Sequence, residues 1–516
     1  MKCKPCVLLG TAGLVTVLFI STSTFAATEL EGNLDKTFPV ASGGKLVIQA
    51  DRGSIEVATD ANGQVHVQVF RKVKGGSKAK AEELLADHEV TLNQDGNTVS
   101  VVAKTKSKLS WSWRTGQPYL EVRYLISIPR RFDVELKTAG GDIHVGDLDG
   151  KAIATTTSGS VRFGAVSGTV EARDAGGDIS INNAGSSVTA HTTSGSITLH
   201  DAKGNVDASN AGGNIRVDQG GADVVASTTS GSIILGSVVG GVRARNAGGD
   251  LRMDSIGGDL VAHTTSGSIR IGEAKGKAAE LRNSGGNIEV GSAEGALTVQ
   301  TTSGSINVPR VKGKLDARNS GGNISVGQAD SDVVLETTSG SIKLKAAKGS
   351  VAAKNSGGDV FLGDAGNDAT IRTTSGSIVV SHIKGKLEAH NSGGEIKIND
   401  ARETVLAQTT SGTLHVTFGA APQGECRLEV AGGGINVGLP ESAAMDVDAR
   451  SSGGRVVTDL PVTTTVKGET RSGVLEGKLN GGGPALVLRS SSGDIRLKPS
   501  AIAPSKIELE DSQKTR

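Results

Sequence analysis

Small aliphatic residues recur along most of this chain at one regular spacing. Around each of them, apolar and polar residues alternate: Val217 lies two positions after Ile215, and Ala208 and Val206 lie seven and nine positions before it. An alternation with period two is typical of β-strands that bury one face. The aliphatic residue recurs at positions 143, 161, 179, 197, 215, 233, 251, 269, 288, 306, 324, 342, 360, 378, 396 and 414.

Every step between these positions is 18 residues except one of 19, and two alternating motifs give a full period of 36. One motif reads T-T-S-G-S-I, as at 192–197, and the other reads N-A-G-G-N-I, as at 210–215. A single 18-residue unit has neither a hydrogen-bond partner nor a second apolar face, so it must stack on its neighbours. The sequence therefore predicts an all-β fold, a long single-chain parallel β-helix (β-solenoid) with about 18 residues per rung. The crossover rule favours right-handed winding, and the alternative is the left-handed hexapeptide class of solenoids, which also has 18 residues per turn.

Looser copies of the motif end at Ile435, Val456 and Ile495, with a degenerate copy near Val474. Counting these copies, twenty rungs stacked about 4.8 Å apart predict a rod on the order of 90 Å long. A glycine recurs two positions before the aliphatic residue, as at Gly195. We expect these glycines to supply a positive φ at the corner of each rung.

The two ends of the chain do not follow the repeat. Residues 1–26 are predicted to be a cleaved signal peptide, because Lys2 and Lys4 precede an apolar stretch of about 14 residues, too short to span a bilayer comfortably. We expect no transmembrane span in the mature chain. Residues 139–498 carry the repeats, which are regular to about 418 and looser after it, and 499–516 are expected to be a flexible tail. Residues 27–138 are the predicted N-terminal cap region, with strand-like runs at 45–50, 54–58, 65–70, 98–103 and 120–128 and a helix at 79–88.

Composition narrows the range of partners and of stabilising interactions. The net charge is +1, so the molecule as a whole does not attract a polyanion. Nucleic acid is therefore not an expected partner. Aromatic residues make up only 2% of the chain, so it cannot build a thick core of large side chains. Cys3 and Cys6 would leave with the signal peptide, so Cys426 would be the one thiol of the mature chain. Stability must then come from the repeated core, without disulfides.

Several short motifs resemble a known family. They are the runs G-K-L-V-I at 44–48, G-S-I-E-V at 53–57 and S-I-P at 127–129, followed by the first G-G-D-I at 140–143 and the serial S-G-S-I copies. Together they resemble the bacterial putative-adhesin domain family of unknown function, whose members are exported and predicted as β-solenoids. The resemblance covers most of the mature chain. It implies an exported solenoid, and it brings no catalytic residues and no cofactor.

One outward position of the repeat is often basic. It lies six residues before the aliphatic residue and would form a column along the rod, called here the basic column. Acidic residues two positions earlier, such as Glu171 and Glu388, would pair with much of it. The column is therefore either a solvated set of ion pairs or a groove for an acidic glycan or phosphorylated envelope polymer. Its members are Arg173, His191, Arg245, His263, Arg282, Arg318, Lys354, Arg372 and His390.

Three further features have alternative interpretations. Trp111 and Trp113 would either pack in the cap or contact a ligand such as a sugar. The Asp or Asn before alternate aliphatic residues, as at Asp178, would either cap turns or bind calcium, although the G-G-x-G-x-D calcium pattern is lacking. On a second edge, six residues after the aliphatic residue, the charge alternates, which avoids repulsion between rungs. These residues are Lys275, Glu294, Lys312, Asp330 and Lys348.

No catalytic motif stands in a supporting context, and the repeat is not broken by a unique set of reactive residues. The leading hypothesis is an exported, non-enzymatic structural or adhesin-like envelope protein that presents a long polar surface to an envelope glycan, a surface protein or another copy of itself. The location is the periplasm or the cell surface, with the periplasm favoured. The alternatives are a carbohydrate-active β-helix enzyme and an envelope-stress sensing component.

Overall fold

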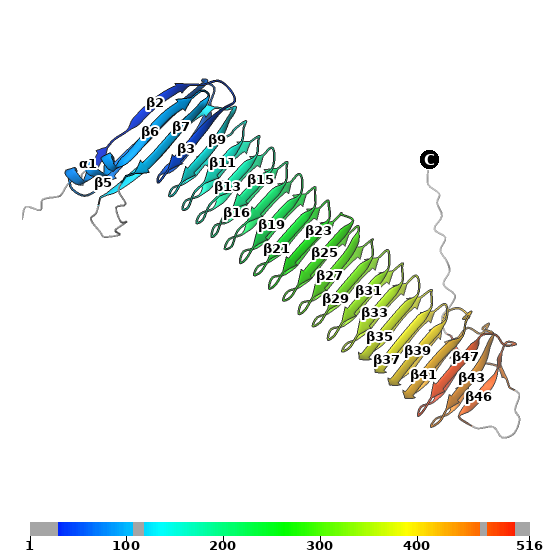
Figure 1. Ribbon diagram of the computed structural model, residues 1–516. Coiled ribbons are helices and arrows are strands. Elements are labelled where there is room, and N and C mark those ends of the chain that lie inside the picture. Colours follow the sequence, from blue (N-terminus) through cyan, green and yellow to red (C-terminus); the bar gives the residue numbers. More distant parts are fainter. Residues whose placement is uncertain (1–28, 107–117, 465–471, 501–516) are drawn as a thin grey trace, which may run out of the picture.

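The computed structural model describes residues 29–106, 118–464 and 472–500, and most of them form a flattened rod of stacked coils (Figure 1). Each coil contributes one strand to each of two sheets, called here sheet A and sheet B, in which neighbouring coils pair in parallel. The predicted parallel β-solenoid with about 18 residues per turn is confirmed. Nothing in the described ranges forms a helix of the length and apolarity needed to cross a membrane.

In sheet A, the strands that follow one another in chain order start with the repeated aliphatic residue. They are β10 (Ile143–Val145), β12 (Val161–Val166), β14 (Ile179–Ala184), β16 (Ile197–Ala202), β18 (Ile215–Gly220), β20 (Ile233–Val238), β22 (Leu251–Ile256), β24 (Ile269–Ala274), β26 (Ile288–Ala293), β28 (Ile306–Val311), β30 (Ile324–Ala329), β32 (Ile342–Ala347), β34 (Val360–Ala365), β36 (Ile378–Ile383), β38 (Ile396–Ala401), β40 (Leu414–Phe418) and β42 (Ile435–Leu439).

Sheet B holds the strand that precedes each of these. Its strands in chain order are β9 (Phe132–Thr138), β11 (Ala152–Thr155), β13 (Val170–Arg173), β15 (Val188–His191), β17 (Val206–Ser209), β19 (Val224–Thr228), β21 (Val242–Asn246), β23 (Leu260–Thr264), β25 (Ala278–Asn283), β27 (Ala296–Thr301), β29 (Leu315–Asn319), β31 (Val333–Thr337), β33 (Val351–Asn355), β35 (Ala369–Ser375), β37 (Leu387–Gly393), β39 (Val405–Ser411) and β41 (Cys426–Gly432).

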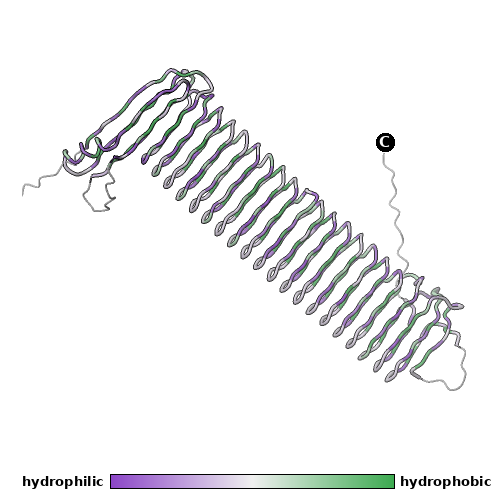
Figure 2. Tube along the Cα trace, viewed as in Figure 1, coloured by the Kyte–Doolittle hydropathy of each residue, from purple (hydrophilic) through white to green (hydrophobic). Residues whose placement is uncertain are grey.

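The core is a thin layer of aliphatic side chains between the two sheets. Figure 2 shows hydrophobic and hydrophilic residues alternating along the coils of the rod. Ile215, Val217, Ala208 and Val206 are all buried, as the alternation predicts. The structure adds a third inward position in sheet A, five residues after the repeated aliphatic, which Val238 and its equivalents occupy. Each coil therefore buries about five small side chains, and the stack as a whole forms one continuous core.

A ladder of Asn and Thr side chains is buried at the end of sheet B, five residues before the aliphatic residue. Asn319 is 5% exposed, and its Nδ2 donates to the carbonyl of Gly304 in the preceding coil at 2.6 Å. Thr337 Oγ1 donates in the same way to the carbonyl of Gly322 at 3.0 Å. The Asn/Thr ladder thus satisfies corner carbonyls that no strand pairs. Its members are Thr138, Thr156, Asp174, Thr192, Asn210, Thr228, Asn246, Thr264, Asn283, Thr301, Asn319, Thr337, Asn355, Thr373, Asn391 and Thr409.

The corner glycines are needed for a different reason from the one predicted. A positive φ occurs at Gly141, Gly159, Gly376, Gly394 and Gly412, but not at Gly195 or its equivalents in the middle of the rod. There the requirement is close stacking, because a Cβ on Gly195 would lie 1.9 Å from the carbonyl oxygen of Gly177 in the preceding coil. Only glycine allows two successive corners to approach so closely.

At the N-terminal end, part of the segment predicted as a cap forms further coils. β3 (Gly44–Ala50) pairs in parallel with β9 on one side and with β7 (Thr98–Thr105) on the other, and β4 (Ser54–Asp60) likewise lies between β10 and β8 (Tyr119–Pro129). The strand edges beyond these coils are covered by antiparallel pairing and by the helix. The covering elements are β1 (Glu29–Glu31), β2 (Leu34–Pro39), β5 (Gln64–Lys74), α1 (Lys78–Asp87) and β6 (His88–Asp95).

At the C-terminal end, the coils do not stack in chain order, contrary to the prediction. β47 (Ala485–Ser490) lies between β41 and β43 (Met445–Ser451), and β48 (Ile495–Pro499) lies between β42 and β44 (Val456–Thr458) (Figure 1). The predicted rung at Val474 is also wrong. Its strand, β46 (Val474–Leu479), lies between β43 and β45 (Val462–Thr463) and runs antiparallel to both, so it extends the end of sheet B instead of adding a coil.

Candidate binding groove

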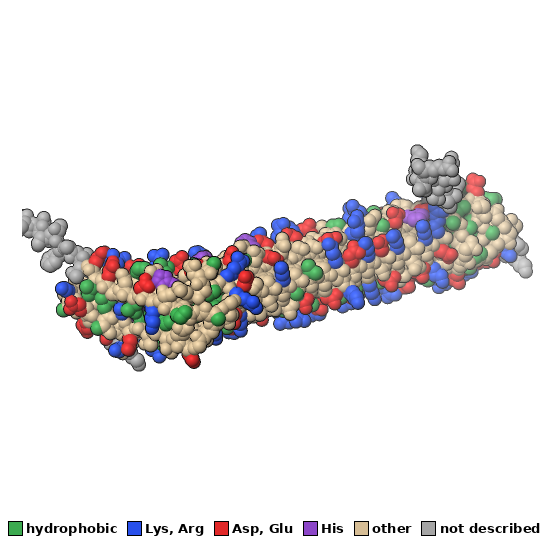
Figure 3. Space-filling view, turned by 90° about the horizontal axis from the view of Figure 1, so that it is seen from above, with side chains coloured by type: hydrophobic (Ala, Val, Ile, Leu, Met, Phe, Trp, Pro, Cys, Tyr) green, Lys and Arg blue, Asp and Glu red, His purple; other side chains and the backbone are tan. Residues whose placement is uncertain are grey.

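Sheet B aligns the basic column on the outer surface of the rod. Parallel pairing places each residue of the column directly beside its equivalent in the next coil, as for Lys354 with Arg372 and Arg372 with His390. The column from Arg173 to His390 is interrupted by Ser209, Ser227, Gln300 and Glu336. Twelve steps of about 4.8 Å make it roughly 58 Å long. Figure 3 shows Lys and Arg in lines along the rod, with Asp and Glu between them.

Most of the basic column is paired with carboxylates. Arg173, Arg282 and Arg318 each reach an acid two residues earlier on their own strand, at 2.9, 2.7 and 3.1 Å. Lys354 pairs with Glu336 of the preceding coil at 3.2 Å, and Arg372 pairs with Glu388 of the following coil at 2.9 Å.

Two further members of the column, Arg245 and His390, differ in whether they have an acidic partner. Among the described residues, Arg245 makes no ion pair and lies on the same strand as a second arginine, Arg243. His390 Nε2 lies 2.8 Å from Glu388 Oε1, and this hydrogen bond holds the pKa of Glu388 below its ordinary value. Much of the column is therefore a set of exposed ion pairs, each of which contributes little to stability.

The structure hollows the surface beside the last part of the column. A groove of about 310 Å³ is lined by Lys354, Arg372 and His390. A second groove of about 440 Å³ continues it along the same edge, since both share Gln408 and Thr410. The lining of the first groove also includes the hydroxyl-bearing residues Ser356, Thr374, Ser392 and Thr410.

A change in backbone path accompanies this groove. β33 ends at the ladder residue Asn355, whereas β35 continues to Ser375, which pairs with Gly393 of the next coil. Gly376 then adopts a φ of 102°, a conformation that favours glycine. The corner from β35 onward therefore follows a different path from the corners in the middle of the rod, at the coils that line the groove.

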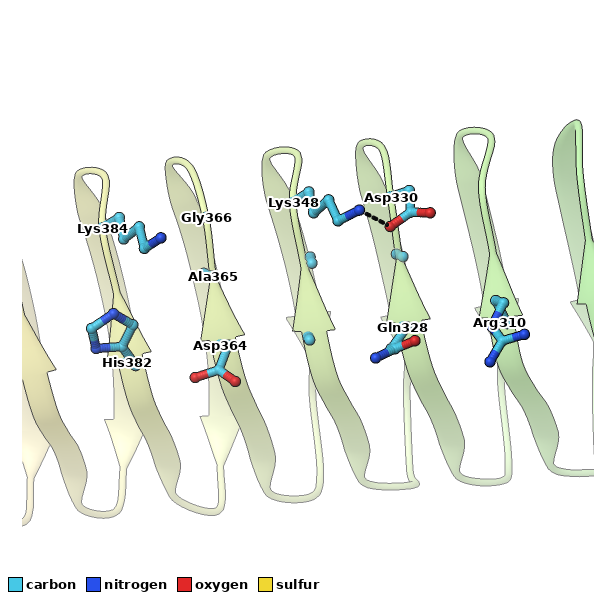
Figure 4. Close-up of a pocket in the computed structure, with 12 residues that line it drawn as sticks. Arg310, Gln328, Asp330, Lys348, Asp364, Ala365, Gly366, His382 and Lys384 are labelled. Atoms are coloured by element: carbon cyan, nitrogen blue, oxygen red, sulfur yellow. Dashed lines mark ion pairs between the residues drawn. The ribbon is translucent and has the colours of Figure 1, made fainter. Parts of the chain in front are cut away.

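The opposite edge of the rod carries the second set of alternating charges. Lys312 pairs with Glu294 at 2.6 Å and Lys348 with Asp330 at 2.8 Å, each acid lying one coil before its lysine. Next to this edge, at the ends of β28 to β36, lies a groove of about 570 Å³ (Figure 4). Its floor is made of small residues, including Ala346 and Gly366.

The Asp and Asn residues before alternate aliphatic positions link neighbouring corners. Asp178 Oδ1 accepts a hydrogen bond from the backbone N–H of Ser196 at 2.8 Å, and Asp250, Asn323 and Asp359 accept equivalent bonds at 2.8 Å. Turn capping accounts for these side chains. The described part of the chain contains no group of three or more His, Cys, Asp or Glu residues arranged to hold a metal ion.

Other predicted features lie outside the described residues. Trp111 and Trp113 fall in 107–117, and the predicted signal peptide and all but the first two residues of the predicted tail are outside as well. Sequence reasoning missed the Asn/Thr ladder. Its signal was available, because the ladder position has the same alternation phase as the inward residues two and four positions before it.

Comparisons with known proteins give one family match. The family model described as Toastrack DUF4097 matches residues 236–366 and 305–498, which together make up just over half of the chain. No significant match is found among curated proteins.

Three solved structures are similar at low identity. A putative adhesin from Bacteroides fragilis is 16% identical, with 55% of this chain and 97% of that chain covered and a TM-score of 0.20. A putative cell adhesion protein from Clostridium sporogenes is 10% identical, with coverages of 42% and 100% and a TM-score of 0.23. A putative lipid binding protein from Parabacteroides distasonis is 12% identical, with coverages of 71% and 96% and a TM-score of 0.16. These values are too low to carry an inference about function, which has to come from the surface of the chain itself.

Proposed function

Because the chain belongs to the Toastrack DUF4097 family, which has no established activity, we propose a function from its own surface. We propose that it is an exported, non-enzymatic, adhesin-like envelope protein that binds a linear anionic glycan in the groove at the last part of the basic column. The observation that carries the proposal is this groove, in which Lys354, Arg372 and His390 stand on three successive coils together with several hydroxyl-bearing residues.

The spacing of these groups suits a polymer better than a compact ligand. Parallel stacking repeats the same cation and the same hydroxyl at about 4.8 Å intervals, so a chain with repeating acidic and hydroxyl groups can make equivalent contacts on successive coils. The second groove continues the same edge past Gln408. A groove open along its length also lets a polymer extend in both directions.

The carboxylates at the groove favour binding over catalysis. A glycosidase needs one carboxyl group that stays protonated near neutral pH, which requires a raised pKa. Glu388 instead has a lowered pKa, because it accepts a hydrogen bond from His390 and pairs with Arg372. Glu336 is likewise paired with Lys354. These carboxylates orient the cations of the column.

Binding to polygalacturonate, with dextran as a neutral control, tests the proposal. The wild-type protein should bind polygalacturonate and not dextran, and binding should weaken as salt rises. A Lys354→Gln/Arg372→Gln double variant should bind about tenfold more weakly or worse, because it loses two charged contacts. Arg282→Gln is the matched control, since Arg282 belongs to the same column but lies outside the groove. Equal binding by the double variant and the control would contradict the proposal.

Two further measurements separate the alternatives. Release of reducing ends from the polysaccharide, abolished in the double variant, would favour the enzyme hypothesis over a binding protein. Fractionation of intact cells with protease shaving tests location. A protein that remains protected until the outer membrane is opened would support the periplasm, whereas digestion on intact cells would place it at the surface.

A further inference from the structure

Two lysines on the second edge, Lys312 and Lys348, lean toward the preceding coil, where an acid lies 18 residues before each of them. Lys275 follows a glycine at that spacing and pairs with Glu273 of its own coil at 3.1 Å. Lys312 meets Glu294 at 2.6 Å, and Lys348 meets Asp330 at 2.8 Å. The neighbouring Lys348 ammonium also holds the pKa of Asp330 below its ordinary value, mainly through their hydrogen bond.

Lys384 occupies the same position one full repeat later. Figure 4 shows its ammonium group extended toward the preceding coil, as that of Lys348 extends toward Asp330. The residue 18 positions earlier is Gly366, which has no side chain. Among the described residues, Lys384 makes no ion pair. The partner that the two preceding repeats supply from the chain is therefore replaced here by open space.

That space belongs to the groove of about 570 Å³ on this edge. Ala346 and Gly366 leave room in this groove. Neighbouring coils have the larger residues Gln328 and Asp364 beside Ala346, and Lys348 at the position of Gly366. Asp364 lies on the same coil as Gly366, is exposed and makes no ion pair among the described residues (Figure 4). Around Lys384 the groove thus offers one unpaired cation and one unpaired carboxylate, because Arg310, the other lining cation without an ion pair among the described residues, lies four coils away.

We infer that this groove is a second binding site, which takes a carboxylate-bearing sugar, a uronate residue, with its carboxylate on Lys384 in the place of the missing acid. One ammonium group neutralises one negative charge, as in the two preceding repeats, so a monoanionic carboxylate fits better than a phosphate dianion. Asp364 would also repel a dianion, whereas it can accept hydrogen bonds from sugar hydroxyl groups. The inference rests on the proposed function only in taking an acidic glycan as the ligand, because the site lies on the edge opposite the basic column.

Calorimetric titration with a trimer of galacturonic acid tests this site, with the fully methyl-esterified trimer as its neutral match. The wild-type protein should bind the acid trimer and not the ester. Lys384→Gln should weaken binding about tenfold or more, since it removes the charged contact. Lys312→Gln, on the same edge but outside the groove and at a lysine that already has its acid, should change binding less than threefold. Gly366→Asp should abolish binding, because it restores the acid of the preceding repeats.

The variants also separate this site from the basic column. Loss of trimer binding in Lys384→Gln but not in Lys354→Gln/Arg372→Gln supports the inference even if the basic column fails its own test. The reverse result would overturn the inference and leave the proposed function standing. Equal binding of acid and ester, or unchanged binding in Lys384→Gln, would also overturn it. Lys384 is exposed, so a folding defect is not expected, and circular dichroism checks this for each variant.

Discussion

The Asn/Thr ladder gives the sharpest test of how the coils are held together, at Asn319. Its Nδ2 donates to the Gly304 carbonyl at 2.6 Å, and its Oδ1 accepts from the Gly321 N–H at 3.2 Å. Asn319→Ala removes both bonds and leaves two corner groups without these partners. At about 1 kcal/mol for each net hydrogen bond, plus the cost of burying unpaired groups, the loss should be about 2–3 kcal/mol.

The repeat itself supplies the control. Thr301 and Thr337 occupy the ladder position in the coils on either side and donate to the preceding glycine carbonyl at 3.2 and 3.0 Å. Asn319→Thr should therefore keep the hydrogen bond to the Gly304 carbonyl and cost less than about 1 kcal/mol of stability. The two variants remove the same side chain and differ in whether a donor remains.

Hydrogen exchange measured by mass spectrometry is the suitable assay, because a solenoid opens by segments and not only as a whole. Amides of residues 300–325 should exchange about 30- to 150-fold faster in Asn319→Ala than in the wild type, which corresponds to 2–3 kcal/mol of local opening free energy. Amides in distant coils should not change. If Asn319→Ala and Asn319→Thr exchange at equal rates, the ladder does not hold the corners together.

Three further predictions concern the corners, the thiol and the cap. Gly213→Ala should destabilise the rod by at least about 2 kcal/mol in urea unfolding, because its Cβ would lie 2.3 Å from the Gly195 carbonyl oxygen. Gly212→Ala is the control and should be nearly neutral, because its Cβ would meet nothing closer than 3.5 Å. Burial raises the pKa of Cys426 to about 11, so this thiol should not react with Ellman's reagent at pH 8 until the protein is unfolded, and fast reaction of the native protein would contradict the packing. Burial lowers the pKa of His88, so the unfolded state takes up a proton before the folded state as pH falls below about 6.5. The stability of the cap should therefore drop by up to about 1.4 kcal/mol per pH unit below that pH. His88→Gln should remove this part of the pH dependence of the unfolding midpoint.

The repeated part of the fold could be predicted from the sequence, because its strands, spacing and core follow from a local alternation. Ile215 and Val217 are buried, and the predicted helix at 79–88 corresponds to α1 at Lys78–Asp87. The groove could not be predicted in the same way. The hexapeptides at 301–306 and 373–378 are identical, yet Gly376 has a positive φ and Gly304 does not. The corner path is therefore set by the coils above and below, not by the local residues.

The order of the end coils was also out of reach of a local pattern. The strands β47 and β48 carry the same kind of alternation as any other coil, so the sequence alone favours stacking in chain order. Which coil they join depends on how the edges at the end of the rod are covered, since β46 pairs antiparallel with the edge of β43 that does not face β47. The charges of the basic column could be placed from the sequence, but the groove beside them depends on the corner path.

The inserted coils at the two ends affect how the rod can be built during synthesis. The coil at 445–458 has no place to dock until residues 485–499 have been made, because they fill the position between it and the coil at 426–439. At the other end, the coil at 44–60 leaves the ribosome early but is completed on both sides only by later segments. The coil at 485–499 is thus clamped between neighbours, so unwinding from the C-terminal side of the described chain must first extract strands held along both edges.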